Sequence, residues 1–353
     1  MNRLLIIRGG AVGDFIVTLP VFAALRQTLG KGHLEVMGHP GRAALAHHPS
    51  YADRITDIEA WDLYRLFSRE SAISDRLTAY LGSFDCIVAY LPDAAEVFVH
   101  RLRQLFSGHL ITWPPHPPTG VHATDHLLRP LHPLCQASFD PIPQVHLTAD
   151  ARAAAERFWR RANLPDSGVL ALHPGSGGIG KRWPPEGWRH LMTWAVEQHI
   201  ACLVINGPAE QKDIDDLLQT APPAAWPCTG TLPLPNLAAV IARCRMLIGH
   251  DSGITHLAAA VGTDTLALFG PTDPWTWGPR SPRACVLTPP GREPLSLTNL
   301  PPRDVLHIAD AMWRGRFDFT PSRLGFTIRQ LANGLSSGDT LQAVAPLSGI
   351  FGI

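Results

Sequence analysis

The stretch MLIGHDSGITHLAAAVGTDTLALFG, residues 246–270, decides the fold class because it contains one complete strand–helix–strand unit. Its two apolar runs, Met246–His250 and Thr265–Phe269, lack the polar alternation of a half-exposed strand. Continuous apolar runs are typical of parallel strands that are covered by helices on both faces. The intervening stretch Gly253–Val261 has the composition and length of a helix. This unit predicts a doubly wound α/β sheet.

The same alternation of strands and helices extends over most of the 353 residues. We predict further strands at Leu4–Arg8, His33–Gly38, Ile55–Ala60, Cys86–Leu91, Leu110–Trp113, Val145–Leu147, Val169–His173, Cys202–Asn206 and Ala284–Leu287. We predict helices at Phe15–Leu29, Ala149–Ala162, Glu186–Gln198, Glu210–Leu218, Asn236–Arg243 and Arg303–Arg314. This pattern predicts two Rossmann-like domains, residues 1–155 and 165–300, then a closing helix at 301–315 and a tail, 316–353, of uncertain order.

Composition excludes several classes of function. Thirty Lys and Arg balance thirty Asp and Glu, so the chain has no global basic field and we expect no nucleic-acid partner. Six Cys without any C-x-x-C pair suit a reducing cytosol rather than a disulfide framework. No apolar stretch approaches the length of about 18 residues that a membrane span needs. We therefore expect a cytoplasmic protein.

The first predicted strand runs into the loop Arg8-Gly9-Gly10-Ala11-Val12-Gly13-Asp14. Glycines such as Gly10 and Gly13 let a backbone approach a ligand closely. Arg8 stands where the dinucleotide fingerprint has its first Gly, so the loop is weak evidence for NAD. Asp14 has two interpretations that both remain open. It is either a carboxylate at a helix start or a general base at the ligand-binding edge of the sheet.

A second glycine-rich loop, HPGSGGIGKRWP at residues 173–184, also joins a strand to a helix. Ser176, Gly177 and the other glycines offer neutral donors, and Lys181 and Arg182 add positive charge, a combination that suits a diphosphate. The P-loop spacing is nearly met, but Arg182 replaces the Ser or Thr that would bind Mg²⁺. That replacement disfavours an ATPase. The alternative is a surface turn without a ligand.

The loop at residues 249–256 places Asp251, Ser252 and Gly253 at the start of a predicted helix, where the dipole and free N–H groups favour an anion. A carboxylate repels phosphate, so we expect Asp251 to accept hydrogen bonds from sugar hydroxyls. His256 lies one turn into the helix and either faces the phosphates or is a satisfied core histidine.

Two apparent metal motifs are set aside. Asp213 and Asp215 spell D-x-D, but they fall in a polar helical stretch rather than at a strand end. His122 and His126 have the i,i+4 spacing of metal ligands. A partly exposed helix explains that spacing equally well, so we expect no metal.

Taken together, the motifs resemble those of glycosyltransferase family 9, the heptosyltransferases. The matching stretches occur in family order and cover about residues 1–315: Gly13-Asp14-x-x-x-x-x-Pro20, His173-Pro174-Gly175-Ser176, Lys181-x-Trp183-Pro184, Asp251-Ser252-Gly253-x-x-His256 and Phe269-Gly270-Pro271-Thr272. The resemblance implies the GT-B fold, two Rossmann-like domains that face a cleft. It also implies an inverting, metal-independent transfer without a cofactor, from a nucleoside-diphosphate sugar to a saccharide or glycolipid.

By position, Asp14 resembles the general base of the family and Lys181 the cation on the leaving diphosphate. The resemblance assigns donor binding to Ser176, Gly177, Glu210, Asp251, Ser252, Gly253 and His256, and an acceptor-side loop to Gly10 and Gly13. It also implies a role in lipopolysaccharide or surface-glycan synthesis, with peripheral contact at the inner face of the inner membrane. The donor sugar, its base and the acceptor stay open. The alternatives are a nucleotide-sugar epimerase and a non-catalytic sugar-nucleotide binding protein.

Overall fold

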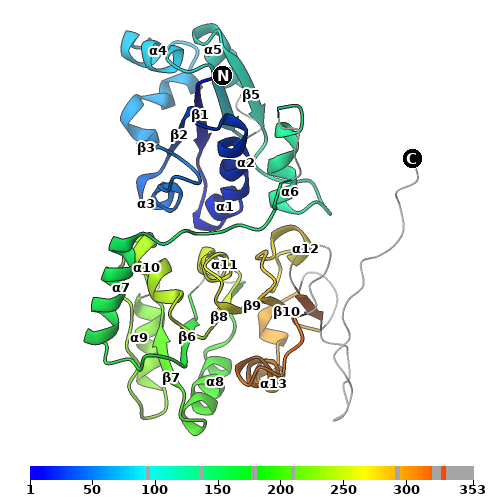
Figure 1. The fold of residues 1–353 in the computed structure, drawn as a ribbon. Helices are drawn as coiled ribbons and strands as arrows, with labels where there is room; N and C mark the ends of the chain where they lie inside the picture. The colour runs from blue at the N-terminus through cyan, green and yellow to red at the C-terminus, as the bar shows by residue number, and fades with distance from the viewer. Residues whose placement is uncertain are drawn as a thin grey trace. The chain divides into compact units, whose positions relative to one another are not determined.

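The computed structural model describes residues 1–92, 96–134, 139–175, 178, 181–207, 211–290, 295–319 and 327–330. The chain divides into two compact units. Unit 1 comprises Met1–Trp159 with Leu232–Val240, and unit 2 comprises Arg160–Thr231 with the chain from Ile241 onward. The division falls inside the helix α7 (Ala149–Arg161). Figure 1 shows a sheet flanked by helices in each unit.

The sheet of unit 1 is parallel and has the strand order β3-β2-β1-β4-β5. Its strands are β1 (Arg3–Arg8), β2 (His33–Gly38), β3 (Arg54–Asp57), β4 (Cys86–Tyr90) and β5 (His109–Trp113). The helices of this unit before α7 are α1 (Val12–Ile16), α2 (Leu19–Leu29), α3 (Pro40–Ala43), α4 (Asp75–Gly82), α5 (Glu96–Leu105) and α6 (Ala123–Leu128). The carboxyl ends of all these strands lie along one edge, because every pairing is parallel.

The sheet of unit 2 is also parallel, with the order β11-β10-β9-β8-β6-β7. Its strands are β6 (Val169–His173), β7 (Ala201–Val204), β8 (Met246–His250), β9 (Asp264–Leu268), β10 (Ala284–Thr288) and β11 (Thr327–Gln330). The helices between these strands in the chain are α8 (Pro185–Glu197), α9 (Gln211–Gln219), α10 (Leu234–Ile241), α11 (Gly253–Ala260), α12 (Pro274–Trp277) and α13 (Pro302–Trp313), of which α10 belongs to unit 1 as far as Val240. The prediction of a doubly wound α/β class is thus confirmed in both units.

One predicted strand was wrong, and one strand was missed. Val145–Leu147 forms no strand, although Val145 is buried. This segment instead packs on the loop after α3, where His146 stacks on His48 at 4.2 Å between ring centroids and Tyr51 donates to the Gln144 carbonyl at 2.6 Å. Conversely, β11 was not predicted. It lies in the tail and extends the sheet by pairing with β10.

The predicted helix Phe15–Leu29 is two helices, α1 and α2. Proline lacks an N–H, so Pro20 cannot lie inside a continuous helix, and α2 begins with Pro20 in its first turn. The helices α1 and α2 also correct the expectation that no stretch of this chain is long and apolar enough to span a membrane. Val12–Leu29 is long and apolar enough to cross a membrane, with a mean hydropathy of 1.3, but 61 % of it is buried inside the structure. Buried core helices meet the same criterion.

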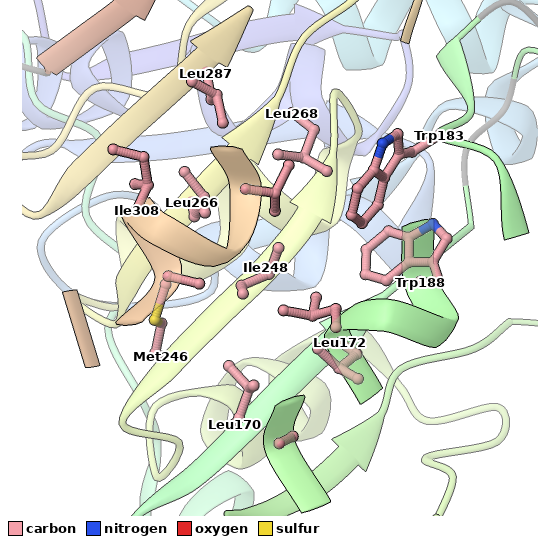
Figure 2. Packing of buried hydrophobic residues seen from close by; sticks show 14 of the residues in the cluster. Leu170, Leu172, Trp183, Trp188, Met246, Ile248, Leu266, Leu268, Leu287 and Ile308 are labelled. Carbon is pink, nitrogen blue, oxygen red and sulfur yellow. The ribbon is translucent and has the colours of Figure 1, made fainter. Parts of the chain in front are cut away.

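Each unit has its own apolar core. In unit 2 the core lies between the sheet and α8 and α13, and Figure 2 shows part of it. Trp183 and Trp188 meet there edge to face, with ring centroids 5.5 Å apart. The indole N–H of Trp183 donates to the Leu300 carbonyl at 2.8 Å. The end of the second glycine-rich loop is therefore fixed by packing.

Unit 1 contains a buried carboxylate, Glu35 on β2, that is fully enclosed. Tyr80 donates to it at 2.6 Å, Thr56 also donates to it, and His33 lies 3.2 Å away. Burial raises the pKa of Glu35, but these hydrogen bonds and the charge of Arg54 outweigh that effect and hold the pKa below its usual value. The carboxylate is thus stabilised in its ionised form by the folded state.

We expect acid to weaken unit 1 through Glu35. Because the pKa is lower in the folded state, the carboxylate stabilises the fold at pH above its unfolded pKa of about 4.3, and this contribution is lost as pH falls through the folded pKa. Glu35→Gln should cost about 1–3 kcal/mol near neutrality and less in acid. Denaturant unfolding of both proteins from pH 7 to pH 3 measures this. A difference that stays constant with pH would contradict the prediction.

Candidate functional site

The loop after β1 is built around Asp14. Gly10 has a φ of +98°, a conformation that favours glycine. A Cβ on Gly10 would also lie 2.8 Å from the Cβ of Asp14, so no larger residue fits. Oδ2 of Asp14 accepts from the Ala11 N–H at 2.8 Å. Asp14 therefore does act as a first-turn cap, and one quarter of its side chain remains exposed at the carboxyl edge of the sheet.

Arg8, at the end of β1, holds this loop in place through hydrogen bonds. It is only 3 % exposed, and its Nε donates to the Thr18 hydroxyl at 2.9 Å. Its Nη2 donates to the Asp14 carbonyl at 3.0 Å and lies 4.0 Å from the Asp14 carboxylate. Burial lowers the pKa of Arg8, while Asp14 and Tyr90 act in the opposite direction. Arg8, which replaces the first Gly of the dinucleotide fingerprint, thus places its guanidinium beside the Asp14 carboxylate.

In unit 2, Lys181 and Asp251 form an ion pair that sequence reasoning did not foresee. Nζ of Lys181 lies 2.6 Å from Oδ2 of Asp251, although the residues are 70 positions apart. The Asp251 side chain is 8 % exposed and follows β8, whereas the Lys181 side chain is 38 % exposed. A partly exposed cation is therefore held by a nearly buried carboxylate.

The neighbouring strand ends carry two histidines, His173 on β6 and His250 on β8. Burial lowers the pKa of His173 to about 4 and that of His250 to about 3, so both rings are neutral at pH 7. Nε2 of His250 accepts from the Trp183 N–H at 2.8 Å. Nδ1 of His173 lies 3.3 Å from the Ser252 hydroxyl. These rings position the two loops and supply no positive charge.

The loop after β8 leads into α11, which begins at Gly253. Thr255 stabilises this turn, because its hydroxyl donates to the Ser252 carbonyl at 2.7 Å and also lies 3.1 Å from the His250 carbonyl, the alternative acceptor. His256 is buried in the first turn of α11. Asp251, Ser252 and Gly253 thus lie together with Lys181 at one helix N-terminus, while Ser176, Gly177 and Glu210 fall outside the described residues.

Other charged groups have structural partners. Nη1 of Arg182 pairs with Asp213 at 2.5 Å, and Asp215 accepts from Gln211 at 2.8 Å, both along α9. The D-x-D residues are therefore on a helix, as predicted.

The histidine pair of α6 is not partly exposed, and that interpretation was wrong, because His122 and His126 are both buried. Nδ1 of His122 accepts from the Thr124 N–H at 3.2 Å, and Nε2 of His126 lies 2.8 Å from the Pro114 carbonyl. Among the described residues, no three His, Cys, Asp or Glu side chains gather in a way that could hold a metal ion.

Comparison with known proteins identifies the family. The sequence profile of glycosyltransferase family 9 (heptosyltransferase) matches residues 85–294. Lipopolysaccharide heptosyltransferase 1 of Pseudomonas aeruginosa is 32 % identical over 305 residues, which cover 77 % of this chain and 79 % of that enzyme. This chain belongs to glycosyltransferase family 9. A match with lipooligosaccharide heptosyltransferase 2 of Haemophilus influenzae, 28 % identical, spans 42 % of this chain and only 45 % of that protein.

Solved structures show that this family 9 glycosyltransferase has the GT-B fold. A glycosyl transferase family 9 protein from Veillonella parvula superposes with a TM-score of 0.74 at 19 % identity, and the match covers 89 % of this chain and 98 % of that one. An E. coli heptosyltransferase solved with ADP superposes with a TM-score of 0.63 at 20 % identity, covering 88 % of this chain and 99 % of that one. The predicted family and fold are thereby confirmed.

Sequence reasoning on this family 9 enzyme missed three side chains that the structure places in the candidate site. The sequence analysis used Arg8 only as an argument against NAD binding. It assigned no role to His173 or His250, the histidines at the ends of two strands. The sequence offered one signal: each is a polar residue that directly follows an apolar run at the end of a strand. Polar residues in such positions lie at the ligand-binding edge of a parallel sheet.

Proposed function

We propose that this family 9 enzyme transfers a heptose or related sugar from a nucleoside-diphosphate sugar to a saccharide or glycolipid acceptor of lipopolysaccharide synthesis. The transfer inverts the anomeric centre and uses no metal. The names of the relatives support the substrate class, and the ADP bound to the E. coli enzyme supports ADP as the nucleoside diphosphate. We place the reaction in the cytoplasm, at the inner face of the inner membrane where a glycolipid acceptor is available.

The observation that carries this proposal is the ion pair of Lys181 and Asp251 at the start of α11. A diphosphate needs positive charge, and the neighbouring histidines are neutral. Arg182 is engaged by Asp213. Among the described residues of these two loops, Lys181 is therefore the cation that can turn toward a diphosphate, because its partly exposed side chain is long and flexible.

The proposed reaction is a single in-line displacement. The acceptor hydroxyl forms the new bond to the anomeric carbon and gives its proton to the Asp14 carboxylate. The bond from that carbon to the diphosphate breaks, and its electron pair stays on the leaving oxygen. Lys181 and the N–H groups at the start of α11 stabilise this growing negative charge. Asp251 then binds sugar hydroxyls once Lys181 has moved to the diphosphate.

A transfer assay tests the proposed function. The protein is incubated with ADP-heptose, or with UDP- and GDP-sugars, and with a heptose-free lipopolysaccharide core acceptor. We expect release of nucleoside diphosphate only when the acceptor is present. Mass spectrometry should show one added sugar, and the proton NMR spectrum of the product should show the inverted anomeric configuration. Free or epimerised sugar without acceptor would favour an epimerase, and nucleotide binding without any turnover would favour a binding protein.

We expect EDTA to leave the transfer rate essentially unchanged. The proposed site opposes the charge of the diphosphate with Lys181 and a helix N-terminus, so it needs no divalent cation. Rates measured in excess EDTA and then with added Mg²⁺ or Mn²⁺ test this. A rate that is lost on chelation and restored by metal would contradict the prediction and would direct attention back to Asp213 and Asp215.

A further inference from the structure

Asn206 is a buried polar residue of unit 2 that the proposed chemistry does not use. It lies two positions beyond the last residue of β7, at the carboxyl end of that strand, and is only 5 % exposed. Its side-chain amide is engaged at both ends. Nδ2 donates to Oε1 of Gln211 at 2.8 Å, and Oδ1 accepts from the Gly230 N–H at 2.8 Å. Asn206 therefore joins two segments that follow it in the chain.

These two segments are the first turn of α9 and the turn at Thr229 and Gly230. Gln211 is held in its orientation by Asp215, which accepts from its Nε2 at 2.8 Å. The backbone of Asn206 adds two contacts, because its N–H donates to the Thr229 hydroxyl at 3.2 Å and its carbonyl lies 3.3 Å from that hydroxyl. Gly230 has a φ of +59°, which favours glycine. The turn is thus fixed to both β7 and α9.

The register of the sheet places Asn206 beside the loops proposed to hold the diphosphate. β6 pairs with β7 on one side and with β8 on the other. The pairing with β7 continues past its last residue, because the Ile205 N–H donates to the Leu172 carbonyl at 2.8 Å. By this register, Asn206 and His250 lie in one row across the sheet. Neighbouring strands are about 4.8 Å apart, so Asn206 lies roughly 10 Å from the strand end that Asp251 follows.

The helix α9 is also bonded to the loop that carries Lys181. Arg182, the next residue in that loop, pairs with Asp213 on α9 at 2.5 Å. Asp213 comes two positions after Gln211, which accepts from Asn206. The first turn of α9 is therefore held both by the proposed diphosphate loop and by Asn206, so a change at Asn206 acts on the donor side of the enzyme.

Nucleotide-binding βαβ units indicate the direction in which a nucleoside extends. In such units a glycine-rich loop follows the first strand, and the ribose binds near the end of the second strand. Here the loop 173–184 follows β6, and β7 is both the next strand of the chain and a neighbour of β6 in the sheet. We therefore expect the nucleoside to extend from the diphosphate toward the turn at Gly230. A Cβ on Gly230 would meet no atom of the described residues within 4 Å, so this turn leaves room for a flat base.

We propose that Asn206 is a positioning residue of the donor site, which fixes the turn at Thr229 and Gly230 as the surface on which the nucleoside packs. The proposal rests on the transferase function proposed above. Both ends of the Asn206 amide are already bonded, so Asn206 acts through the turn and not by contact with the nucleoside. The diphosphate stays with Lys181 and the start of α11. Asn206 thus contributes to nucleoside affinity and to selection among bases, and not to the chemical step.

Calorimetry with ADP and with pyrophosphate tests this role, because pyrophosphate has the diphosphate but lacks the nucleoside. Asn206→Ala should weaken ADP binding about tenfold, through loss of the hydrogen bonds that hold the turn, and should bind pyrophosphate like wild type. Gln211→Ala removes only the bond to α9 and should weaken ADP binding less. Lys181→Ala should weaken the binding of both ligands. Gln219→Ala is the matched control, because Gln219 is an exposed glutamine at the other end of α9, and it should bind both ligands like wild type.

Base selection and steady-state rates give two further measurements. Wild type and Asn206→Ala are titrated with ADP, UDP and GDP, and we expect the differences in affinity among the three to shrink in the variant. In the transfer assay KM for the donor should rise, while kcat and KM for the acceptor stay constant. Thermal unfolding checks that each variant is folded. If Asn206→Ala does not fold, Gln211→Ala decides the question, because its side chain is exposed.

The outcomes separate this proposal from the proposed function. Unchanged ADP affinity in Asn206→Ala and Gln211→Ala overturns the role of Asn206 even if transfer is normal. Equal weakening of ADP and pyrophosphate also overturns it, because Asn206 would then support the whole donor site rather than the nucleoside. A wild type that binds none of the three nucleotides overturns both proposals. Weakened ADP binding with pyrophosphate binding retained, in a protein that transfers no sugar, supports the role of Asn206 and refutes the transferase.

Discussion

Asp14→Asn is expected to lower the turnover rate by about 10²- to 10⁴-fold, the usual contribution of a general base. Asparagine has almost the same shape, and its amide oxygen can still accept from the Ala11 N–H, so the cap in the first turn of α1 is kept. The bonds from Arg8 to the Asp14 carbonyl and to Thr18 do not involve the carboxylate either. The substitution therefore keeps the hydrogen bonds of the loop, while it removes the proton acceptor and the negative charge that lies 4.0 Å from the Arg8 guanidinium.

Steady-state rates and ADP affinity distinguish this role from a purely structural one. We expect ADP to bind Asp14→Asn within a few-fold of wild type, and the free energy of unfolding to change by no more than about 1 kcal/mol. Asp57→Asn is the matched control, because Asp57 also caps a helical turn in unit 1 by accepting from the Glu59 N–H at 2.9 Å. If folded Asp14→Asn retains near-normal turnover, Asp14 is a helix cap and no more.

Lys181→Ala is expected to weaken ADP binding by about 1.5–3 kcal/mol and also to lower the turnover rate. Charge grows on the leaving oxygen as the glycosidic bond breaks, so a cation there stabilises the transition state more than the bound donor. Lys181→Arg should rescue only part of the loss, because a planar guanidinium fork does not replace a compact ammonium group. Arg182→Ala should lose less, since Arg182 pairs with Asp213.

The ion pair with Asp251 requires a second variant. Lys181→Ala leaves the Asp251 carboxylate, which is 8 % exposed, without its partner, and that negative charge alone would repel a diphosphate. Calorimetry with ADP on Lys181→Ala, Asp251→Asn and the double variant separates the two effects. If Lys181 contacts the diphosphate, the double variant stays weak. If Lys181 only neutralises Asp251, the double variant binds ADP like wild type, and the assignment of Lys181 is wrong.

Residue composition alone predicts some strands of this protein correctly and others wrongly. Runs such as Met246–His250 are apolar over their whole length, so their burial between helices follows from composition alone. Val145–Leu147 has the same local composition but finds its partners in the loop after α3 rather than at a sheet edge. The strand β11 exists because β10 offers it a free edge, and the segment Thr327–Gln330 has too few residues to show a period of its own.

By itself, the sequence determined the α/β class, the family and the loops that carry polar groups at the strand ends. These features depend on the order of residues within about twenty positions, because strand burial, helix starts and glycine turns are local properties. The tertiary structure decided which of those groups act on one another. It paired Lys181 with Asp251 and aligned Trp113 with Arg8 through Tyr90. Such contacts follow from strand order and register, which arise only when segments far apart in the chain pack against each other.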